Sequence, residues 1–522
     1  RHTGLWGTRM RLCFSDTETF SEVPLANGVH AYAEAAEVMI WTYAFDDGPV
    51  ETWDLTNGAP MPADLAEALS DEATLFVWHN YGFDAPVIRH ALSIEISLDR
   101  VHCTMAQALA HGLPGSLDAL CGILGVPVDK AKDKHGKQLI NLFCKPRPKN
   151  SKIWRATHET HPEEWKQFLE YARLDIEAMR QVYKKLPVWN YSGSELALWQ
   201  LDARINARGF AVDTDLARAA IRAVDLAQSS LAARTAEATG GRVGSANQRD
   251  ALLRYILAEH DVALPDLRGD TLDRRLNDPE LPAAVRDLIA LRLSASTTST
   301  AKYRKLIGAV SSDGRLRGTL QFCGASRTGR WSGRTFQPQN LPSKGLPPQD
   351  EIDRGIEAIK AEVADLVCPD VMRITSAAIR GCIVAPPGKK LVVSDLSNIE
   401  GRDAAWLAGE EWKLKAFREF DAGRGHDLYK LAYAKAFRVE PESVTKSQRQ
   451  IGKVMELALG YEGGVGAFCT FAAVYGIDLD VMAQTAVSAI PPRVWREAQD
   501  AWAWAAEKNR TYGLDELTYC VC

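Results

Sequence analysis

The alternation of short apolar runs with helical patterns in the first 186 residues is the feature that most limits how this chain can fold. Four runs have the length and the neighbouring turn residues of strands, at residues 12–14, 38–45, 50–55 and 75–78. From His161 to about Leu186, apolar residues recur at the spacing of one buried helix face, and Pro187 ends the pattern. Strands that alternate with helices predict an α/β domain.

Acidic residues follow two of these strands. Asp16 and Glu18 close the first strand one residue apart, so both carboxylates lie on the same side of an extended chain. Asp84 comes just after the run 75–78, and Tyr171 and Asp175 share one face of the later helix because four residues separate them. Singly, each is an ordinary turn, cap or surface residue. Together, four carboxylates suffice to hold the two metal ions that phosphodiester hydrolysis uses.

The order of these residues resembles the proofreading exonucleases of the DnaQ-like superfamily, in the subgroup whose last motif carries Tyr. The resemblance covers about residues 10–186 and implies an RNase H-like mixed sheet. It also implies two Mg²⁺ ions per site, with Mn²⁺ as an alternative, on Asp16, Glu18, Asp84 and Asp175, and an attacking water oriented by Tyr171. Asn80 and Phe83 would shape the pocket for the terminal nucleotide.

Charge and composition favour a soluble globular protein. The net charge of −5 gives no overall sign of a nucleic-acid partner. Residues 130–155 nevertheless contain nine Lys or Arg against one acid, and residues 302–344 repeat that ratio, which suits either a phosphate-tracking groove or solvated loops. The scattered cysteines and the absence of a long apolar run predict a cytoplasmic protein with no membrane partner, in a bacterium or a phage-infected host.

The middle of the chain reads as almost continuous helix from residue 193 to residue 310, with a capping box at Ser245 and Gln248. Beyond it, a polar segment runs from Gly324 through Arg330 to Gln339, Asn340 and a Leu-Pro pair. Such a segment suits contact with phosphates and base edges.

A second group of motifs follows an apolar run at residues 390–394, which we expect to be a buried strand and the start of a second α/β unit. Asp395 stands at its end, where a rigid backbone can hold a metal ligand, and Glu400 and Arg402 follow. Farther on, Arg449, Lys453, Leu457 and Tyr461 recur every four residues on one helix face, so two cations lie one turn apart.

These rear motifs resemble those of family A DNA polymerases. The resemblance implies thumb, palm and fingers of the α+β type, with primer-template DNA and dNTPs as partners. It assigns a metal to Asp395, exclusion of a ribose 2′-hydroxyl to Glu400, minor-groove reading to Arg330 and DNA contact to Gln339, Asn340 and Arg402. It assigns the dNTP to Arg449, Lys453, Tyr461 and Tyr429. Leu396, Asn398, Gly401 and Leu457 depart from the family pattern.

A later His-Asp-Glu motif of that family is not found, and Asp515-Glu516 is a poor candidate for it. We therefore expect a C-terminally incomplete polymerase, helped by a processivity factor or a missing C-terminal chain. The expected parts are a leader (1–9), an exonuclease domain (10–190), a helical thumb region (191–312) and a partial palm and fingers (313–522). The alternatives are an exonuclease whose rear half only grips DNA, and a non-catalytic primer-template binding factor.

Overall fold

The computed structural model describes residues 10–127, 130–276, 278–296, 300–343, 345–460 and 463–522. The chain divides into two compact units, one of residues 1–391 and one of residues 392–522. Within the described ranges, no helix is long and apolar enough to cross a membrane.

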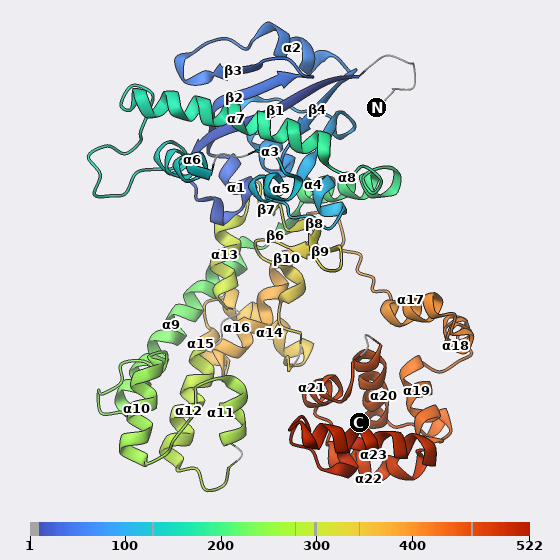
Figure 1. The fold of residues 1–522 in the computed structure, drawn as a ribbon. Helices are drawn as coiled ribbons and strands as arrows, with labels where there is room; N and C mark the ends of the chain where they lie inside the picture. Colours follow the sequence, from blue (N-terminus) through green and yellow to red (C-terminus); the bar gives the residue numbers. More distant parts are fainter. Residues whose placement is uncertain (1–9, 128–129, 277, 297–299, 344, 461–462) are drawn as a thin grey trace. The chain divides into compact units, whose positions relative to one another are not determined.

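The first unit begins with a five-stranded mixed sheet (Figure 1). Its strands are β1 (Arg11–Ser21), β2 (Ala36–Phe45), β3 (Val50–Asp54), β4 (Thr74–Trp78) and β5 (Val101–Cys103). In the order β3-β2-β1-β4-β5, the first three strands pair antiparallel, whereas β4 and β5 run parallel to β1. The predicted α/β domain with a mixed sheet is confirmed.

Strand β1 lies at the centre of the sheet, and its two faces enter different cores because successive side chains alternate. Cys13 packs with Trp41 and Trp78, whereas the next residue, Phe14, packs with Ile176 on the opposite face. The strand also runs on to Ser21, so Asp16 and Glu18 lie within it and not at its close, as the sequence suggested. A bulge between Glu18 and Thr19 shifts the pairing with β2 at this point.

Helices pack around this sheet. They are α1 (Val29–Ala33), α2 (Ala63–Ser70), α3 (Tyr81–Leu92), α4 (Thr104–Ala110), α5 (Leu117–Leu124), α6 (Lys130–Phe143) and α7 (Pro162–Lys185). Helix α7 crosses β1, β2 and β3 and buries the stripe predicted from its spacing, from Trp165 to Ile176. Pro162 suits the first position of the helix, where no N–H is needed. The acids Glu163 and Glu164 in the first turn and Lys184 and Lys185 in the last turn match the two ends of the helix dipole.

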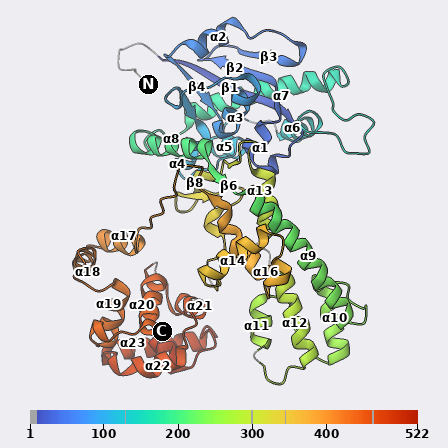
Figure 2. The ribbon, with the colours of Figure 1, turned by 180° about the vertical axis from the view of Figure 1, so that it is seen from behind.

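A helical arm leaves the sheet domain along α9, and α10 to α12 gather at its far end (Figure 2). Before the arm, α8 (Gly193–Arg208) packs on the core of the sheet domain through Trp199. The helices of the arm are α9 (Thr214–Ala238), α10 (Arg249–His260), α11 (Gly269–Leu276), α12 (Ala283–Ala295) and α13 (Ala301–Ala309). The capping box expected at Ser245 is wrong. Gln248 itself is the N-cap of α10, and the Ser245 hydroxyl accepts from the Asn247 amide at 3.2 Å, because the intervening turn holds it there.

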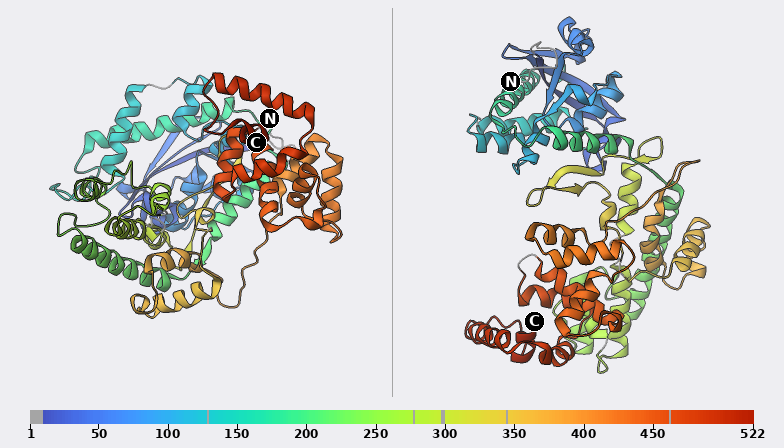
Figure 3. Two further views of the ribbon diagram at one scale, coloured as in Figure 1. Left: turned by 90° about the horizontal axis from the view of Figure 1, so that it is seen from below. Right: turned by 90° about the vertical axis from the view of Figure 1, so that its right-hand side faces the viewer.

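The rest of the first unit combines small sheets with short helices. β6 (Phe210–Val212) pairs with both β7 (Arg315–Leu316) and β10 (Ile383–Val384), and β8 (Leu320–Ala325) forms a hairpin with β9 (Arg330–Gly333). The helices here are α14 (Gln349–Lys360), α15 (Ala364–Val367) and α16 (Val371–Ala378). The hairpin, yellow in Figure 3, lies against α8 and α4.

In its described residues, the second unit consists of helices joined by turns and coil. Its helices are α17 (Ile399–Ala408), α18 (Glu411–Asp421), α19 (Leu428–Phe437), α20 (Lys446–Leu459), α21 (Val465–Tyr475), α22 (Leu479–Ala486), α23 (Pro492–Glu507) and α24 (Glu516–Val521). The strand and second α/β unit expected from residue 390 are not observed. Residues 390–394 are coil, and Val392 and Val393 are exposed, because this segment pairs with no strand in the part of the chain described.

Candidate functional site

Three of the predicted carboxylates form a compact cluster. Asp16 and Glu18 come from β1 and Asp175 from α7, and one ligand oxygen from each lies within 4.8 Å of the others. Asp84, in the first turn of α3, is held by the Thr17 hydroxyl, which donates to its Oδ1 at 2.6 Å. The structure therefore brings together all four acids that the sequence placed on separate elements.

Burial and mutual repulsion raise the pKa values of this cluster. The pKa of Asp16 lies well above its usual range because of burial and then the charges of Asp84, Glu18 and Asp175. Burial, followed by the charges of Asp175 and Asp84, raises the pKa of Glu18. Burial raises the pKa of Asp84 to about 7, against the opposing hydrogen bond from Thr17. A hard divalent cation prefers such an all-oxygen donor set, and its charge would relieve the repulsion. The residues present therefore fit the implied metal.

Tyr171 lies one helical turn before Asp175 and stays protonated. Burial, followed by the charges of Asp175 and Glu18, raises the pKa of the phenol far above its ordinary value. Its ring packs directly on Gly136 of α6, where an added Cβ would lie 2.4 Å from the ring. A neutral phenol can donate a hydrogen bond to a water bound beside the carboxylates.

Sequence reasoning missed several residues around this cluster. Thr17 positions Asp84, and the Cys144 thiol lies 3.9 Å from Glu18 Oε2. The only available signal for Thr17 was its place inside the Asp-Thr-Glu tripeptide, and no spacing pointed to Cys144 or Gly136. Phe83, expected near the terminal nucleotide, packs 5.6 Å from the Tyr32 ring.

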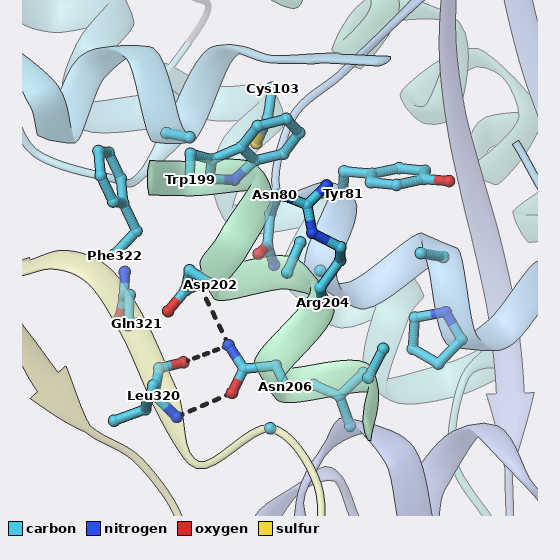
Figure 4. Close-up of a pocket in the computed structure, with 18 of the residues that line it drawn as sticks. Asn80, Tyr81, Cys103, Trp199, Asp202, Arg204, Asn206, Leu320, Gln321 and Phe322 are labelled. Carbon is cyan, nitrogen blue, oxygen red and sulfur yellow. Dashed lines mark hydrogen bonds between the residues drawn. The ribbon is translucent and has the colours of Figure 1, made fainter. Parts of the chain in front are cut away.

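A separate cavity of about 850 Å³ lies between α3, α8 and the hairpin strand β8, and Asn80 is among its lining residues (Figure 4). The Asn206 side chain donates to the Leu320 carbonyl and to Asp202, and its oxygen accepts from the Leu320 amide. Asn206 thus fastens the hairpin to α8. Burial raises the pKa of Asp202 to about 6, although Phe322 and Asn206 oppose the rise.

The polar motif of the first unit lies at the surface. Arg330 begins β9 and is exposed, as are Gln339 and Asn340 at the end of a short turn. The end of the Gln339 side chain packs on Gly333 of β9, and it would have to move if Gly333 carried a Cβ. The arrangement leaves the three predicted DNA-contacting side chains accessible.

In the second unit, two of the predicted triphosphate ligands lie on α20, Arg449 beside α19 and Lys453 beside α21. Arg449 of α20 contacts both Asp427 oxygens at 3.1 Å, and its guanidinium lies 5.1 Å from the Tyr429 ring centroid. The Lys453 ammonium lies 4.8 Å from the Tyr475 ring centroid. Tyr461, predicted to complete the row, is outside the described residues. Helix α20 starts with a capping box at Thr445 and Gln448, which sequence reasoning overlooked.

The other predicted polymerase residues lie in the coil and helices of the second unit. Asp395 is exposed in coil, and Glu400 lies in the first turn of α17. Arg402 donates to both Asp421 oxygens, at 2.7 and 2.8 Å, and its guanidinium lies 4.5 Å from the Phe417 ring centroid. Asp515, the weak candidate for a second metal ligand, caps α24 by accepting from the Thr518 amide at 2.7 Å.

Comparisons with known proteins give two family matches. Residues 270–481 match the model for DNA polymerase family A, and residues 41–188 match that for a 3′-5′ exonuclease. The DNA polymerase of Bacillus phage SP02 is 35% identical over 472 residues, which is 89% of this chain and 71% of that protein. DNA polymerase I of Chloroflexus aurantiacus is 35% identical over 106 residues, only 20% of this chain and 10% of that protein.

A solved structure has a related fold. The POL domain of Pol1 from M. smegmatis, in complex with DNA primer-template and dNTP, covers 94% of this chain and 75% of its own, with a TM-score of 0.50. At 17% sequence identity, the likeness concerns the fold alone.

Proposed function

Because the chain belongs to the family A DNA polymerases and carries a 3′-5′ exonuclease domain, we propose that it extends primer-template DNA with dNTPs during replication and excises mismatched 3′ ends at a separate site. It is a nucleotidyltransferase and an exonuclease, and both activities of this family depend on divalent metal ions. We assign excision to residues 10–190, the thumb to 191–312 and palm and fingers elements to 313–522.

The carboxylate cluster carries the proposal for excision. Asp16, Glu18, Asp84 and Asp175 would hold two Mg²⁺ ions, which supply a water of lowered pKa and charge stabilisation for the leaving oxygen. The Tyr171 hydroxyl, kept neutral by its surroundings, would donate to that water and orient it. The Thr17 hydrogen bond fixes the Asp84 carboxylate before DNA arrives, so less ordering remains to be done in the transition state.

The rear residues support the proposal for synthesis. Arg449 and Lys453 would bind the triphosphate with charge-assisted hydrogen bonds, beside Tyr429 and Tyr461. Asp395 would bind the catalytic metal, and Glu400 would exclude a ribose 2′-hydroxyl. Arg330, Gln339, Asn340 and Arg402 would contact the DNA, in keeping with the exposed positions of the first three.

One labelled primer tests both activities. With Mg²⁺ and dNTPs, the chain should excise a mismatched 3′ end by itself, and it should extend a matched one when complemented with a chain that carries the later His-Asp-Glu motif. Asp16→Asn should slow excision by about 10²-fold or more while extension continues, because a metal ion contributes several kcal/mol of charge stabilisation. Asp395→Asn should do the reverse, and Asp118→Asn, an exposed acid on α5, should change neither. A wild-type chain that excises but never extends, even when complemented, would support a dedicated exonuclease instead.

A further inference from the structure

The loop between α6 and α7 is basic and presents a large aromatic side chain. From residue 144 to residue 156 it carries five cations and no acid, namely Lys145, Arg147, Lys149, Lys152 and Arg155. Trp154 in the same loop is 55% exposed. Since the whole chain has a net charge of −5, this loop is a local exception. Exposed aromatics beside cations are typical of surfaces that bind single-stranded nucleic acid.

The loop is anchored at both sides of Trp154. The Arg147 amide donates to the Trp154 carbonyl at 2.8 Å, and the Ser151 amide donates to the Pro148 carbonyl at 2.8 Å. On either side of Trp154, Ile153 and Ala156 pack into the core with Phe143 and Phe168. The indole is therefore held on a rigid base while much of its surface faces solvent, as a stacking platform requires.

Trp154 lies close to the carboxylate cluster. Its ring meets the edge of Phe20 at a centroid distance of 5.6 Å, and Phe20 follows Glu18 by two residues on β1, about 7 Å along a strand. The loop itself starts at Cys144, whose thiol lies 3.9 Å from Glu18. A strand whose last phosphodiester sits on the carboxylates would therefore bring a neighbouring base within reach of the indole.

Of the basic residues of the loop, Arg155 has a structural contact, whereas Lys149 and Lys152 can bind a ligand. The Arg155 guanidinium lies 3.9 Å from the Phe20 ring centroid and forms an ion pair with Glu37 at 2.8 Å, so it braces the loop. Lys149 and Lys152 are exposed, and neither pairs with an acid of the described residues. These two ammonium groups can meet phosphates.

We propose that Trp154 stacks on a base next to the 3′ terminus of the single strand being excised, and that Lys149 and Lys152 contact its backbone. The proposal rests on the excision function proposed for the carboxylate cluster and adds the residue that positions its substrate. Stacking of one base changes affinity by about 5- to 150-fold. Trp154 is thus a positioning residue that sets KM, with little influence on the bond-breaking step.

Excision of a single-stranded oligonucleotide by the full chain tests this. Trp154→Ala should raise KM about 5- to 150-fold with kcat nearly unchanged, and Trp154→Phe should restore most of the loss. Trp189→Ala is the matched control, since Trp189 is 75% exposed in the same domain. Hydrolysis of the p-nitrophenyl ester of thymidine 5′-monophosphate, which is too short to reach Trp154, should be equal in all variants.

Each outcome has a separate meaning. An unchanged KM in Trp154→Ala overturns the proposal and would leave Trp154 as part of a surface for another protein. A parallel loss with the small ester also overturns the proposal, because Trp154 would then be structural. Wild-type chain that hydrolyses neither substrate would contradict the excision function instead. In that case 2-aminopurine placed next to the 3′ end, with EDTA present, decides on Trp154 alone: stacking quenches its fluorescence, and Trp154→Ala should abolish the quenching.

Discussion

Gly136→Ala should damage excision by moving one ring. The added Cβ would lie 2.4 Å from Cε2 and 2.7 Å from Cδ2 of Tyr171, whereas ordinary contact begins at 3.4 Å. The ring must therefore shift by about 1 Å, the difference between 3.4 and 2.4 Å. The three atoms nearest to the added Cβ all belong to the Tyr171 ring, and the four carboxylates come from elements other than α6.

A displacement of about 1 Å in a positioning group costs about 10²-fold in rate, or about 2.7 kcal/mol of activation free energy. The substitution itself favours the helix, because alanine stabilises a helix interior by about 0.5–1 kcal/mol relative to glycine. We therefore expect excision to fall about 10²-fold in kcat without a comparable loss in stability against unfolding.

The assay is single-turnover excision of a mismatched primer terminus, accompanied by extension of a matched primer. Extension should be unchanged in Gly136→Ala. Gly122→Ala on α5 is the control, because nothing lies within 4 Å of its added Cβ. Tyr171→Phe should lose a similar factor by removing the hydroxyl. If Gly136→Ala excised within twofold of wild type, the positioning role assigned to Tyr171 would be refuted.

Three further changes should have distinct effects. Asp202 has a pKa of about 6 in the folded protein against an ordinary 3.8, so the destabilisation caused by its ionisation grows as the pH rises from 3.8 to 6. Asp202→Asn should therefore raise the free energy of unfolding by up to about 3 kcal/mol at pH 8 and by little at pH 4, as measured by urea titration. Arg449→Ala should raise the KM for dNTPs about 10- to 150-fold in primer extension, whereas Arg493→Ala, a surface cation paired with Glu497, should not. Mg²⁺ added after EDTA should raise the unfolding temperature of wild type by relieving repulsion in the carboxylate cluster, and Asp175→Asn should reduce that rise.

Local pattern predicted the front of the molecule well. The alternation in β1 and the stripe of α7 determine which side chains face each other, so Asp16, Glu18 and Asp175 could be expected to converge. Their exact surroundings could not, because the contact of Gly136 with Tyr171 depends on how α6 packs on α7, which no residue spacing in the sequence marks. Similarly, the run at 390–394 has strand composition, but a strand also needs a partner for its backbone, which composition does not reveal.

Helix capping shows the same limit of prediction from sequence, because one capping box that was predicted is absent and one that was not predicted is present. Ser245 and Gln248 have the spacing of a capping box but form a turn, whereas Thr445 and Gln448, with the same spacing, form the box at the start of α20. Spacing alone cannot tell which residue the helix begins on.

The pairing of Arg449 with Asp427 means that nucleotide binding at α20 would be an exchange of anions. Both Asp427 oxygens accept from the Nε–H of Arg449, and Asp427 also caps α19, so this carboxylate cannot move away without loosening that helix. A phosphate that takes this N–H must replace a carboxylate, and the affinity gained at Nε is the difference between two ionic interactions. Ligands with one phosphate gain little from such an exchange, whereas a triphosphate that also reaches Lys453 gains more. The resident carboxylate would thus act as a competitor that favours triphosphates over products of their hydrolysis.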